Sequence, residues 1–368
     1  PRLDPSMPDI LLSNARILDV DAGRYHSGRF VLVEDGRIAS INDSRPHTSA
    51  REIDLGGRVL MPGLCDAHVH VTATTADLGS LPRTAPSYVA QQARQIIEAM
   101  LLRGFTTVRD AGGADYGLAQ AVEDGLITGP RILFCGHALS QTGGHGDTRL
   151  RGELGLASGC ACCVSLGFVC DGVPDVRKQC REEIRKGANQ IKLMVSGGVA
   201  SPTDRIDSTQ FAEEEIRAAV EEAQAANIPV MAHAYTARAI NRALEFGVDS
   251  IEHGNLLDET SVELLKKYDK FLVPTLITYR ALKEEGVAAG LPASMAMKIA
   301  SVEHAGLNAL RLAHEAGVKI AFGSDLLGAM HKRQLEEFEI RSAVQKPIDM
   351  IRSATTVAAE LFRLSDEI

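Results

Sequence analysis

The chain has 368 residues, of which 45% are hydrophobic and 24% charged, and its formal net charge at pH 7 is -9. This composition is that of an ordinary folded protein, and the length suits a large α/β barrel with an added small domain. The acidic balance gives no reason to expect nucleic acid as a partner. No run of about 18 apolar residues occurs, so the sequence predicts no membrane span.

The N-terminal stretch and the cysteines bear on the compartment. The stretch PRLDPSMPDI has neither a basic region nor an apolar one, so a signal peptide is not expected. The seven cysteines are odd in number, and four of them crowd into CACCVSLGFVC (Cys160, Cys162, Cys163 and Cys170). Because no second CxxC pair or nearby histidine accompanies them, we expect reduced thiols instead of a zinc knot. We therefore predict a cytoplasmic protein and, as its assembly, a homo-oligomer.

The first sixty residues differ from the rest in their pattern of apolar and polar residues. Residues 9–41 alternate apolar and polar positions, with turn signals at 21–23 and 34–36, which predicts short antiparallel strands. From residue 61 onward, short apolar segments alternate with longer helical patterns, as in repeated βα units. We therefore predict two domains, a segment of short antiparallel strands over 1–60 and a barrel with C-terminal helices over 61–368.

Eight segments after residue 60 are predicted as strands: 63–71, 105–112, 131–139, 190–198, 229–236, 250–255, 271–279 and 319–325. Helical patterns such as 87–103, 211–226 and 293–316 lie between them, and 333–345 and 348–363 follow the last one. Eight strands with intervening helices predict a (β/α)8 TIM barrel. The long connection 140–173 is expected to be a lid or substrate-binding loop. No strand pattern follows the eighth, so either the N-terminal strands form their sheet alone or C-terminal strands are missing from this sequence.

The first predicted barrel strand carries two histidines. In GLCDAHVHV, alternation places His68 and His70 on one face, near the C-terminal end of the strand. Active sites of such barrels are built at that end. A pair of histidines alone is equally consistent with imidazoles hydrogen-bonded to backbone.

Polar side chains also occur in four other strands. They are Lys192 in QIKLMVSGG, His233 in PVMAHAYT, His253 in SIEHGN and Asp325 in KIAFGSD. A lysine inside an apolar strand must have its charge paired or neutralised, because an isolated buried ammonium is very costly. Six such side chains converging on one barrel mouth indicate a site and not packing.

The chemistry of these side chains indicates two divalent cations, with Zn²⁺ as the first choice. Imidazoles and carboxylates are the usual ligands of such ions. Lys192 would be a poor ligand as an ammonium, whereas carboxylation by CO₂ would give a carbamate whose two oxygens can bridge two metals. The absence of an acidic residue in its strand supports this hypothesis.

The motifs MPGLCDAHVH, MAHAYT, SIEHGN and FGSD, with the mid-strand Lys192, resemble the amidohydrolase superfamily in its binuclear, carboxylated-lysine form. Within it, TGGHGD, IKLMVSGGVASP and HAYT look most like Xaa-Pro dipeptidases (prolidases) and Xaa-Arg/Lys carboxypeptidases. The resemblance implies that His68, His70, Lys192 and Asp325 bind the more buried metal. It implies that His233 and His253 bind the second metal, with the Lys192 carbamate bridging. It also implies a small β-sandwich built from both termini, with residues 1–60 as its N-terminal segment and with its C-terminal strands missing here.

The mechanism expected from this resemblance is attack by a metal-bridging hydroxide. Asp325, a metal ligand beside it, would take the proton and pass it to the leaving amine. His145 and Tyr235 can each donate a hydrogen bond and are candidates to stabilise the oxyanion. Arg109 and Arg149 are weaker candidates to hold a substrate carboxylate, and ion pairs with a neighbouring aspartate explain both more simply.

The expected function is hydrolysis of an amide bond in a small substrate, a dipeptide, with Xaa-Pro first and a C-terminal Arg or Lys second. Hydrolysis of a cyclic amide, as in imidazolonepropionase-like members, or of a lactone or ester, is an alternative. A non-catalytic scaffold would be expected to have lost metal ligands, and all six are present here. Asp66 shares a strand face with the two histidines and is expected to orient a ligand ring.

Overall fold

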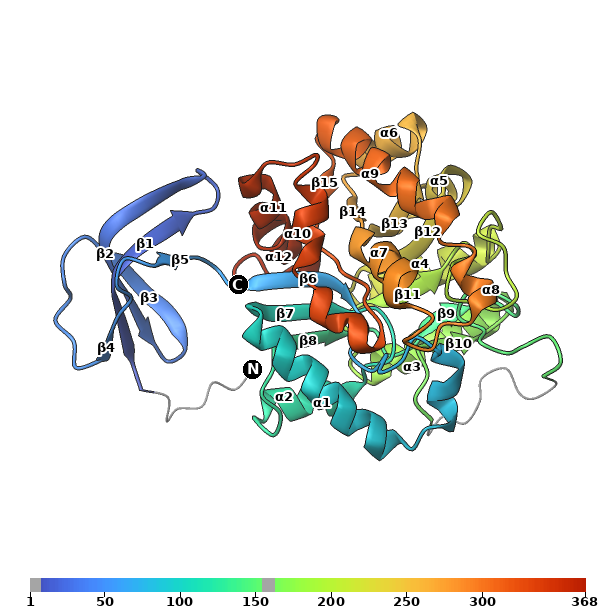
Figure 1. The fold of residues 1–368 in the computed structure, drawn as a ribbon, viewed down its shortest axis with the longest axis horizontal. Coiled ribbons are helices and arrows are strands. Elements are labelled where there is room, and N and C mark those ends of the chain that lie inside the picture. Colours follow the sequence, from blue (N-terminus) through green and yellow to red (C-terminus); the bar gives the residue numbers. More distant parts are fainter. Residues whose placement is uncertain (1–7, 154–162) are drawn as a thin grey trace. The chain divides into compact units, whose positions relative to one another are not determined.

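The computed structural model describes residues 8–153 and 163–368, and the chain divides into two compact units. One unit extends to Gly63 and includes Ile368, and the other is Leu64–Glu367 (Figure 1). All the predicted site residues belong to the second unit. None of the described helices is long and apolar enough to cross a membrane.

The first unit is a five-stranded sheet made of β1 (Ile10–Asp19), β2 (Arg24–Glu34), β3 (Arg37–Asn42), β4 (Arg51–Asp54) and β5 (Val59–Leu60). The strands β1, β2 and β3 pair antiparallel, which confirms the prediction for residues 9–41. Asp35 and Gly36 both have positive φ (50° and 70°), as a two-residue hairpin requires. The strands β4 and β5, which the sequence pattern did not reveal, pair parallel to β1.

The second unit contains two sheets in which every pairing is parallel. The three-stranded sheet has the order β6 (Leu64–Val69), β7 (Phe105–Asp110), β8 (Arg131–Phe134). The seven-stranded sheet has the order β10 (Gly167–Val169), β9 (Ala138–Ser140), β11 (Ile191–Met194), β12 (Val230–Thr236), β13 (Ser250–Leu256), β14 (Phe271–Val273), β15 (Lys319–Ile320). With the helices between them, these strands make a mixed α/β fold.

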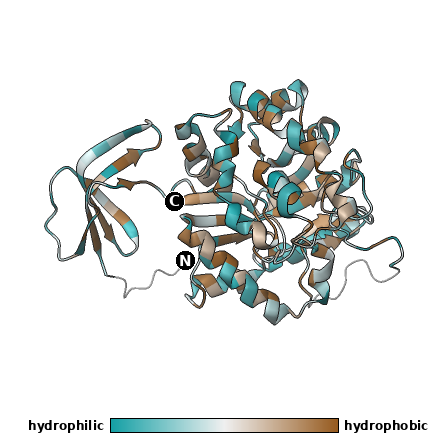
Figure 2. Ribbon diagram, in the orientation of Figure 1, coloured by the Kyte–Doolittle hydropathy of each residue, from teal (hydrophilic) through white to brown (hydrophobic). Residues whose placement is uncertain are grey.

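The helices follow the strands along the chain and carry both hydrophilic and hydrophobic residues (Figure 2), as helices with one buried face do. They are α1 (Pro86–Leu102), α2 (Tyr116–Glu123), α3 (Gly172–Arg185), α4 (Glu213–Ala225), α5 (Ala237–Glu245), α6 (Glu259–Lys267), α7 (Leu276–Glu285), α8 (Ala293–Ala296), α9 (Ala300–Glu315), α10 (Glu336–Arg341), α11 (Pro347–Ser353) and α12 (Thr356–Phe362). Two 3-10 helices, η1 (Leu78–Arg83) and η2 (Gly328–Arg333), complete the set of described helices.

Strand register separates the apolar layer from the polar one. Leu193, Ala232 and Ile251 are aligned across β11, β12 and β13, and all three pack in one buried aliphatic cluster. One residue further along β12 and β13, His233 is aligned with Glu252. Because side chains alternate along a strand, the residues beside the aliphatic row point to the opposite face of the sheet.

Backbone hydrogen bonds connect the two sheets. The N–H of Ala67 in β6 donates to the carbonyl of Phe322 (2.7 Å), and the N–H of Asp325 donates to that of His68 (2.8 Å). At the other edge, the N–H of Asn189 donates to the carbonyl of Phe134 in β8 (2.8 Å). The end of β6 therefore lies against the segment that follows β15, although hundreds of residues separate them in sequence.

The prediction of a strand over 271–279 is wrong in its second half. The strand β14 ends at Val273, and α7 begins at Leu276. Pro274 has no N–H to continue the ladder, and proline is excluded from strand interiors for that reason. The predicted helix over 293–316 is two helices, α8 and α9. The described cysteines, which include Cys163 and Cys170, are free thiols, and Cys160 and Cys162 lie outside the described residues.

Candidate metal centre

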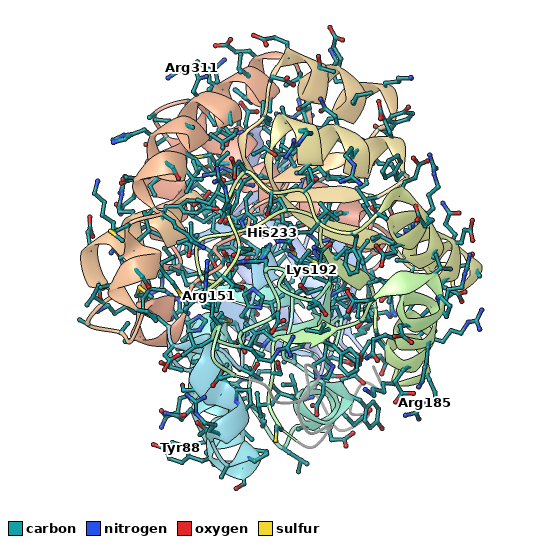
Figure 3. The ribbon with its side chains drawn as sticks, turned by 90° about the vertical axis from the view of Figure 1, so that its right-hand side faces the viewer. Tyr88, Arg151, Arg185, Lys192, His233 and Arg311 are labelled. Carbon is teal, nitrogen blue, oxygen red and sulfur yellow. The ribbon has the colours of Figure 1, made fainter. Side chains whose placement is uncertain are left out.

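The six predicted ligand residues line one cavity that opens to solvent. They come from five places in the fold: β6 and its end (His68, His70), β11 (Lys192), β12 (His233), β13 (His253) and the segment after β15 (Asp325). Figure 3 shows Lys192 and His233 in the middle of the unit, with Arg185 and Arg311 at its periphery. His145 and Tyr235 line the same cavity.

Two of the imidazoles are held through Nδ1. His68 Nδ1 lies 2.8 Å from Glu252 Oε2, and the Nδ1–H of His70 donates to the carbonyl of Gly112 (2.9 Å). In both rings Nε2 is then the nitrogen that can face a cation, and its neighbour in the structure is Asp325 Oδ1. Imidazoles that bind metals are usually held in this way through their second nitrogen.

The other two imidazoles are held by different nitrogens. His253 Nδ1 lies 2.7 Å from Thr275 Oγ1, which leaves Nε2. The Nε2–H of His233 donates to the carbonyl of Gly197 (3.1 Å), which leaves Nδ1. Burial lowers the pKa values of His68, His233 and His253, so these rings are neutral and can offer a lone pair.

Asp325 lies among these rings. Its Oδ1 is 3.4 Å from His68 Nε2 and 3.2 Å from His70 Nε2. Donor atoms of His68, His253 and Asp325 lie within 4.8 Å of one another, close enough to share one ion. Burial acts to raise the pKa of Asp325, but His68 and the hydrogen bond from His70 outweigh it, so the pKa lies below its usual range.

Lys192 is 1% exposed and lies in the middle of β11. Among the described residues, no carboxylate lies within ion-pair distance of its Nζ. Burial lowers the pKa of Lys192, against the opposing charges of Glu252 and Asp325. The uncharged amine is therefore favoured relative to an exposed lysine.

The backbone is strained at two of these positions. His253 has φ 74° and is followed by Gly254 with φ 63°, and Asp325 has φ 51°. Non-glycine residues adopt this left-handed region at a cost of about 1–3 kcal/mol, and such residues cluster at functional sites. The strain supports a site that aims these two side chains.

His145 and Tyr235 extend the polar part of the cavity. The His145 ring stacks on that of His233 with centroids 4.2 Å apart, and its Nδ1 lies 2.8 Å from Ser201 Oγ. Burial lowers the pKa of His145 to about 4, although the charge of Asp204 acts to raise it. The hydroxyl of Tyr279 donates to that of Tyr235 (3.1 Å), which leaves the Tyr235 proton for another acceptor.

The ion-pair interpretation of Arg109 is confirmed, with Glu252 as the partner in place of an aspartate, and the prediction for Asp66 is wrong. Arg109 is buried and donates to the carbonyl of Ala67 and to Glu252 Oε1 (both pairs within 2.8 Å), so it holds the strands together and not a substrate. Asp66 does not orient a ring. It accepts hydrogen bonds from the backbone of His68 and Ser324, which ties β6 to the segment that carries Asp325.

Arg149 forms a two-point contact with Asp147, at 2.8 and 2.6 Å, as the ion-pair interpretation of that residue predicts.

The sequence reasoning missed Glu252, Thr275 and Asp204. Glu252 carried the same signal as Lys192, a charge inside an apolar strand. Thr275 and Asp204 lie in loops, where the sequence shows no periodicity that could have marked them.

Comparisons with known proteins agree with this arrangement. The model of the amidohydrolase family matches residues 59–368. An ochratoxinase of Aspergillus niger is 35% identical over 318 residues, which cover 82% of this chain and 65% of that protein. The chain thus spans about two thirds of the length of that curated relative.

Two solved structures are similar over nearly the whole chain. A prolidase complexed with N-methylphosphonate-L-proline has a TM-score of 0.95 and 49% identity, with 98% of this chain and 89% of that one covered. A Xaa-Pro dipeptidase with methionine bound in its active site has a TM-score of 0.86 and 29% identity, with 97% and 89% covered. With the family model matching most of its length, the chain belongs to the amidohydrolase family.

Proposed function

We propose that this protein is a metal-dependent hydrolase that cleaves the amide bond of a dipeptide with C-terminal proline. The observation that carries the proposal is the set of four imidazoles, each held through one nitrogen with the other left for a cation, beside Lys192 and Asp325. The similarity to a prolidase and to a Xaa-Pro dipeptidase supports the substrate class.

The proposal includes the barrel. The backbone bonds of Ala67 and Asn189 support closure of the two parallel sheets into one (β/α)8 barrel, formed by residues 61–368 with the C-terminal helices. Residues 1–60 would be part of a small β-sandwich. The predicted sites then lie at the C-terminal ends of the strands, where barrels assemble active sites.

The donor set fits two divalent cations such as Zn²⁺. His68, His70 and Asp325 would hold one, and His233 and His253 the other, with Lys192 carboxylated by CO₂ as a ligand of both. The buried, unpaired amine of Lys192 supports this modification. When bound, such cations acidify a water molecule and polarise a carbonyl group.

The chain's own residues would then position the substrate and move protons. Asp325 would accept a proton from the attacking water and transfer it to the leaving amine nitrogen. Tyr235 would donate a hydrogen bond from its hydroxyl to the developing oxyanion, and His145, which lines the same cavity, would contact the substrate through Nε2. Leu78, Leu166 and Leu327 line the cavity and would exclude water.

The cavity lining also bears on the alternatives. Asp325 is the one acidic residue among the described lining residues, and residues 154–162 contain no charged side chain. A C-terminal Arg or Lys would therefore be buried without a partner, which is costly and disfavours the carboxypeptidase alternative. The activity of the ochratoxinase is the second candidate, favoured by its 35% identity.

A library of Xaa-Pro dipeptides and N-acyl prolines, assayed with the zinc-loaded protein, tests the proposal. We expect turnover of Xaa-Pro substrates with apolar Xaa, and none of the same dipeptides ending in Arg or Lys. Absence of turnover for every aminoacyl and acyl proline would contradict the peptidase assignment. Parallel assay of ochratoxin would then show whether the second candidate holds.

A further inference from the structure

The loop that follows β11 holds the His145 ring in place. Gly198 contacts the ring, since a Cβ at that position would lie 2.2 Å from His145 Cε1. The other side of the ring stacks on His233, with an angle of 20° between the planes. A side chain at position 198 would collide with the ring, so glycine is required there. Between Gly198 and His233 the ring has little room to rotate.

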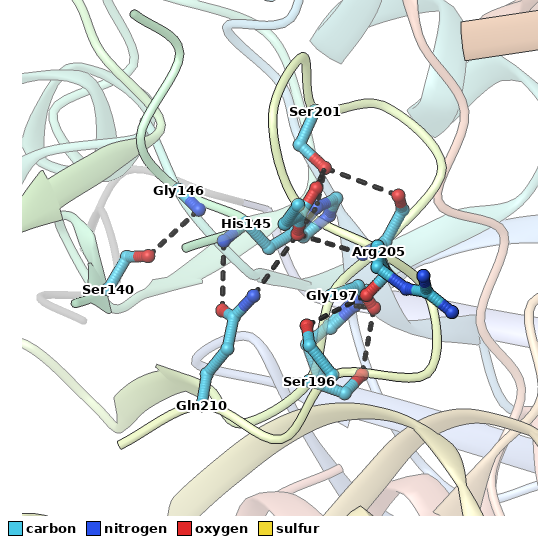
Figure 4. A network of polar contacts seen from close by, with 12 residues as sticks. Ser140, His145, Gly146, Ser196, Gly197, Ser201, Arg205 and Gln210 are labelled. Atoms are coloured by element: carbon cyan, nitrogen blue, oxygen red, sulfur yellow. Dashed lines mark hydrogen bonds and ion pairs between the residues drawn. The ribbon is translucent and has the colours of Figure 1, made fainter. Parts of the chain in front are cut away.

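Hydrogen bonds decide which ring nitrogen carries a proton. Ser201 Oγ lies 2.8 Å from His145 Nδ1 (Figure 4). It is also within hydrogen-bond distance of Asp204 Oδ1 and of the Gly198 carbonyl. Both of the latter can only accept, because a carboxylate and a carbonyl have no proton. Ser201 therefore gives its single proton to one of them and accepts a hydrogen bond from the Nδ1–H of His145.

Asp204 also reaches the backbone of His145. Its Oδ2 accepts from Gln210 Nε2 (3.1 Å). Gln210 Oε1 in turn accepts from the N–H of His145 (2.9 Å), a contact visible in Figure 4. The same Oδ2 accepts from the N–H of Gly198 (3.1 Å). One carboxylate, 2% exposed, thus connects to the ring, the main chain and the glycine that contacts the ring.

A lysine from a distant part of the chain holds this loop. Lys298, between α8 and α9, donates from Nζ to the carbonyls of Gly198, Ser201 and Asp204 at 3.0, 2.8 and 2.9 Å. Three carbonyls on one ammonium fix the path of residues 198–204. Residues 198–204, which contact the His145 ring, are thus held in place by contacts that do not involve a substrate.

We propose that Asp204, acting through Ser201 and Gln210, is a positioning residue that holds His145 as the Nδ1–H tautomer, with Nε2 left unprotonated to accept a hydrogen bond from the substrate. The proposal rests on the proposed function for its kinetic consequence, because His145 is assigned there to contact the substrate. An unprotonated Nε2 accepts a hydrogen bond, so the oxyanion-donor role expected for His145 from the sequence does not fit this tautomer. The hydrogen-bond assignment stands independently of any substrate.

The kinetic test compares three variants of the zinc-loaded protein with Xaa-Pro substrates. Ser201→Ala and Asp204→Asn should each lower kcat by roughly 10-fold to 100-fold, the size expected when a reacting group is misplaced. KM and zinc content should stay within about 3-fold of wild type, and the double variant should be no worse than either single one, because the residues act as one unit. Ser208→Ala removes a hydroxyl from the same loop that bonds to the Arg205 carbonyl, and it should leave kcat unchanged.

The second test does not depend on turnover. Nitrogen NMR of the histidine rings, with His145→Gln used to identify the His145 signals, should show a protonated Nδ1 in wild type and loss of that state in Ser201→Ala. An unprotonated Nδ1 in wild type would overturn the proposal, and so would additive losses in the double variant. If no proline substrate is turned over, the proposed function fails, and the NMR result alone decides the positioning role.

Discussion

At the scale of single residues, the centre depends on the partner of each imidazole. Thr275 shows this most simply, because its Oγ1 is 2.7 Å from His253 Nδ1 and the residue is fully buried. With His253 donating to this hydroxyl, Nε2 is the nitrogen left for a cation. The left-handed backbone of His253 (φ 74°) is held by the same surroundings.

Thr275→Val should therefore weaken metal binding with little change in fold, since valine matches threonine in shape but cannot accept a hydrogen bond. Loss of such a partner typically lowers metal affinity by about 10-fold to 100-fold. Zinc affinity measured by competition with a chromogenic chelator checks this. Thr107→Val, a buried threonine in β7, is the matched control, and equal zinc affinity in the two variants would count against the assignment of Thr275.

Lys192 gives a second test at this scale. If its amine is carboxylated, native mass spectrometry of the metal-loaded protein should show one added CO₂, which acidification releases. Lys192→Ala should lose the metals, and short carboxylic acids added to the medium should restore part of the binding. An unmodified amine in the fully loaded protein would refute the carbamate.

At the scale of elements, β14 ends two residues before Thr275, and the Thr275 side chain bonds to His253. Thr275 stands at the N-cap of α7 but makes no side-chain cap bond there. Glu337 of α10 caps the start of α7 instead, because its Oε2 accepts a hydrogen bond from the N–H of Ile277 (2.7 Å). The helix that follows the strand is thus capped from another helix.

Glu337→Ala should lower the free energy of unfolding by about 1–3 kcal/mol, the cost of leaving a buried donor without its partner. Glu339→Ala, on the exposed side of the same helix, should change it by less than about 0.5 kcal/mol. Urea unfolding of both variants measures the difference. Equal stabilities would show that Glu337 does not cap α7.

The β11 strand and the α7 helix show what the sequence could and could not predict. Lys192 was visible because a charge interrupts an apolar run, and a buried charge needs a chemical reason. The first residues of α7, 276–279, were assigned to a strand because their apolar side chains continue those of β14, and periodicity cannot separate a short strand from a buried helix. Asp204 and Thr275 could not be predicted, because loop conformation decides what they contact.

At the scale of the whole molecule, all candidate ligands belong to the unit Leu64–Glu367. They come from strands far apart in sequence, so an ion bound by them stabilises the folded unit over the unfolded chain. Zinc at about 100 times its Kd should stabilise the protein by about 2.7 kcal/mol through mass action. Calorimetry before and after chelation should show a lower Tm without zinc in wild type and a much smaller shift in Asp325→Asn.

The central claim is that this cavity binds two metal ions. Anomalous diffraction at the zinc edge, from crystals grown with zinc, tests it most directly. The account predicts two peaks, one beside His68, His70 and Asp325 and one beside His233 and His253, with density beyond the Nζ of Lys192 reaching toward both. A single peak, or none among these residues, would contradict it.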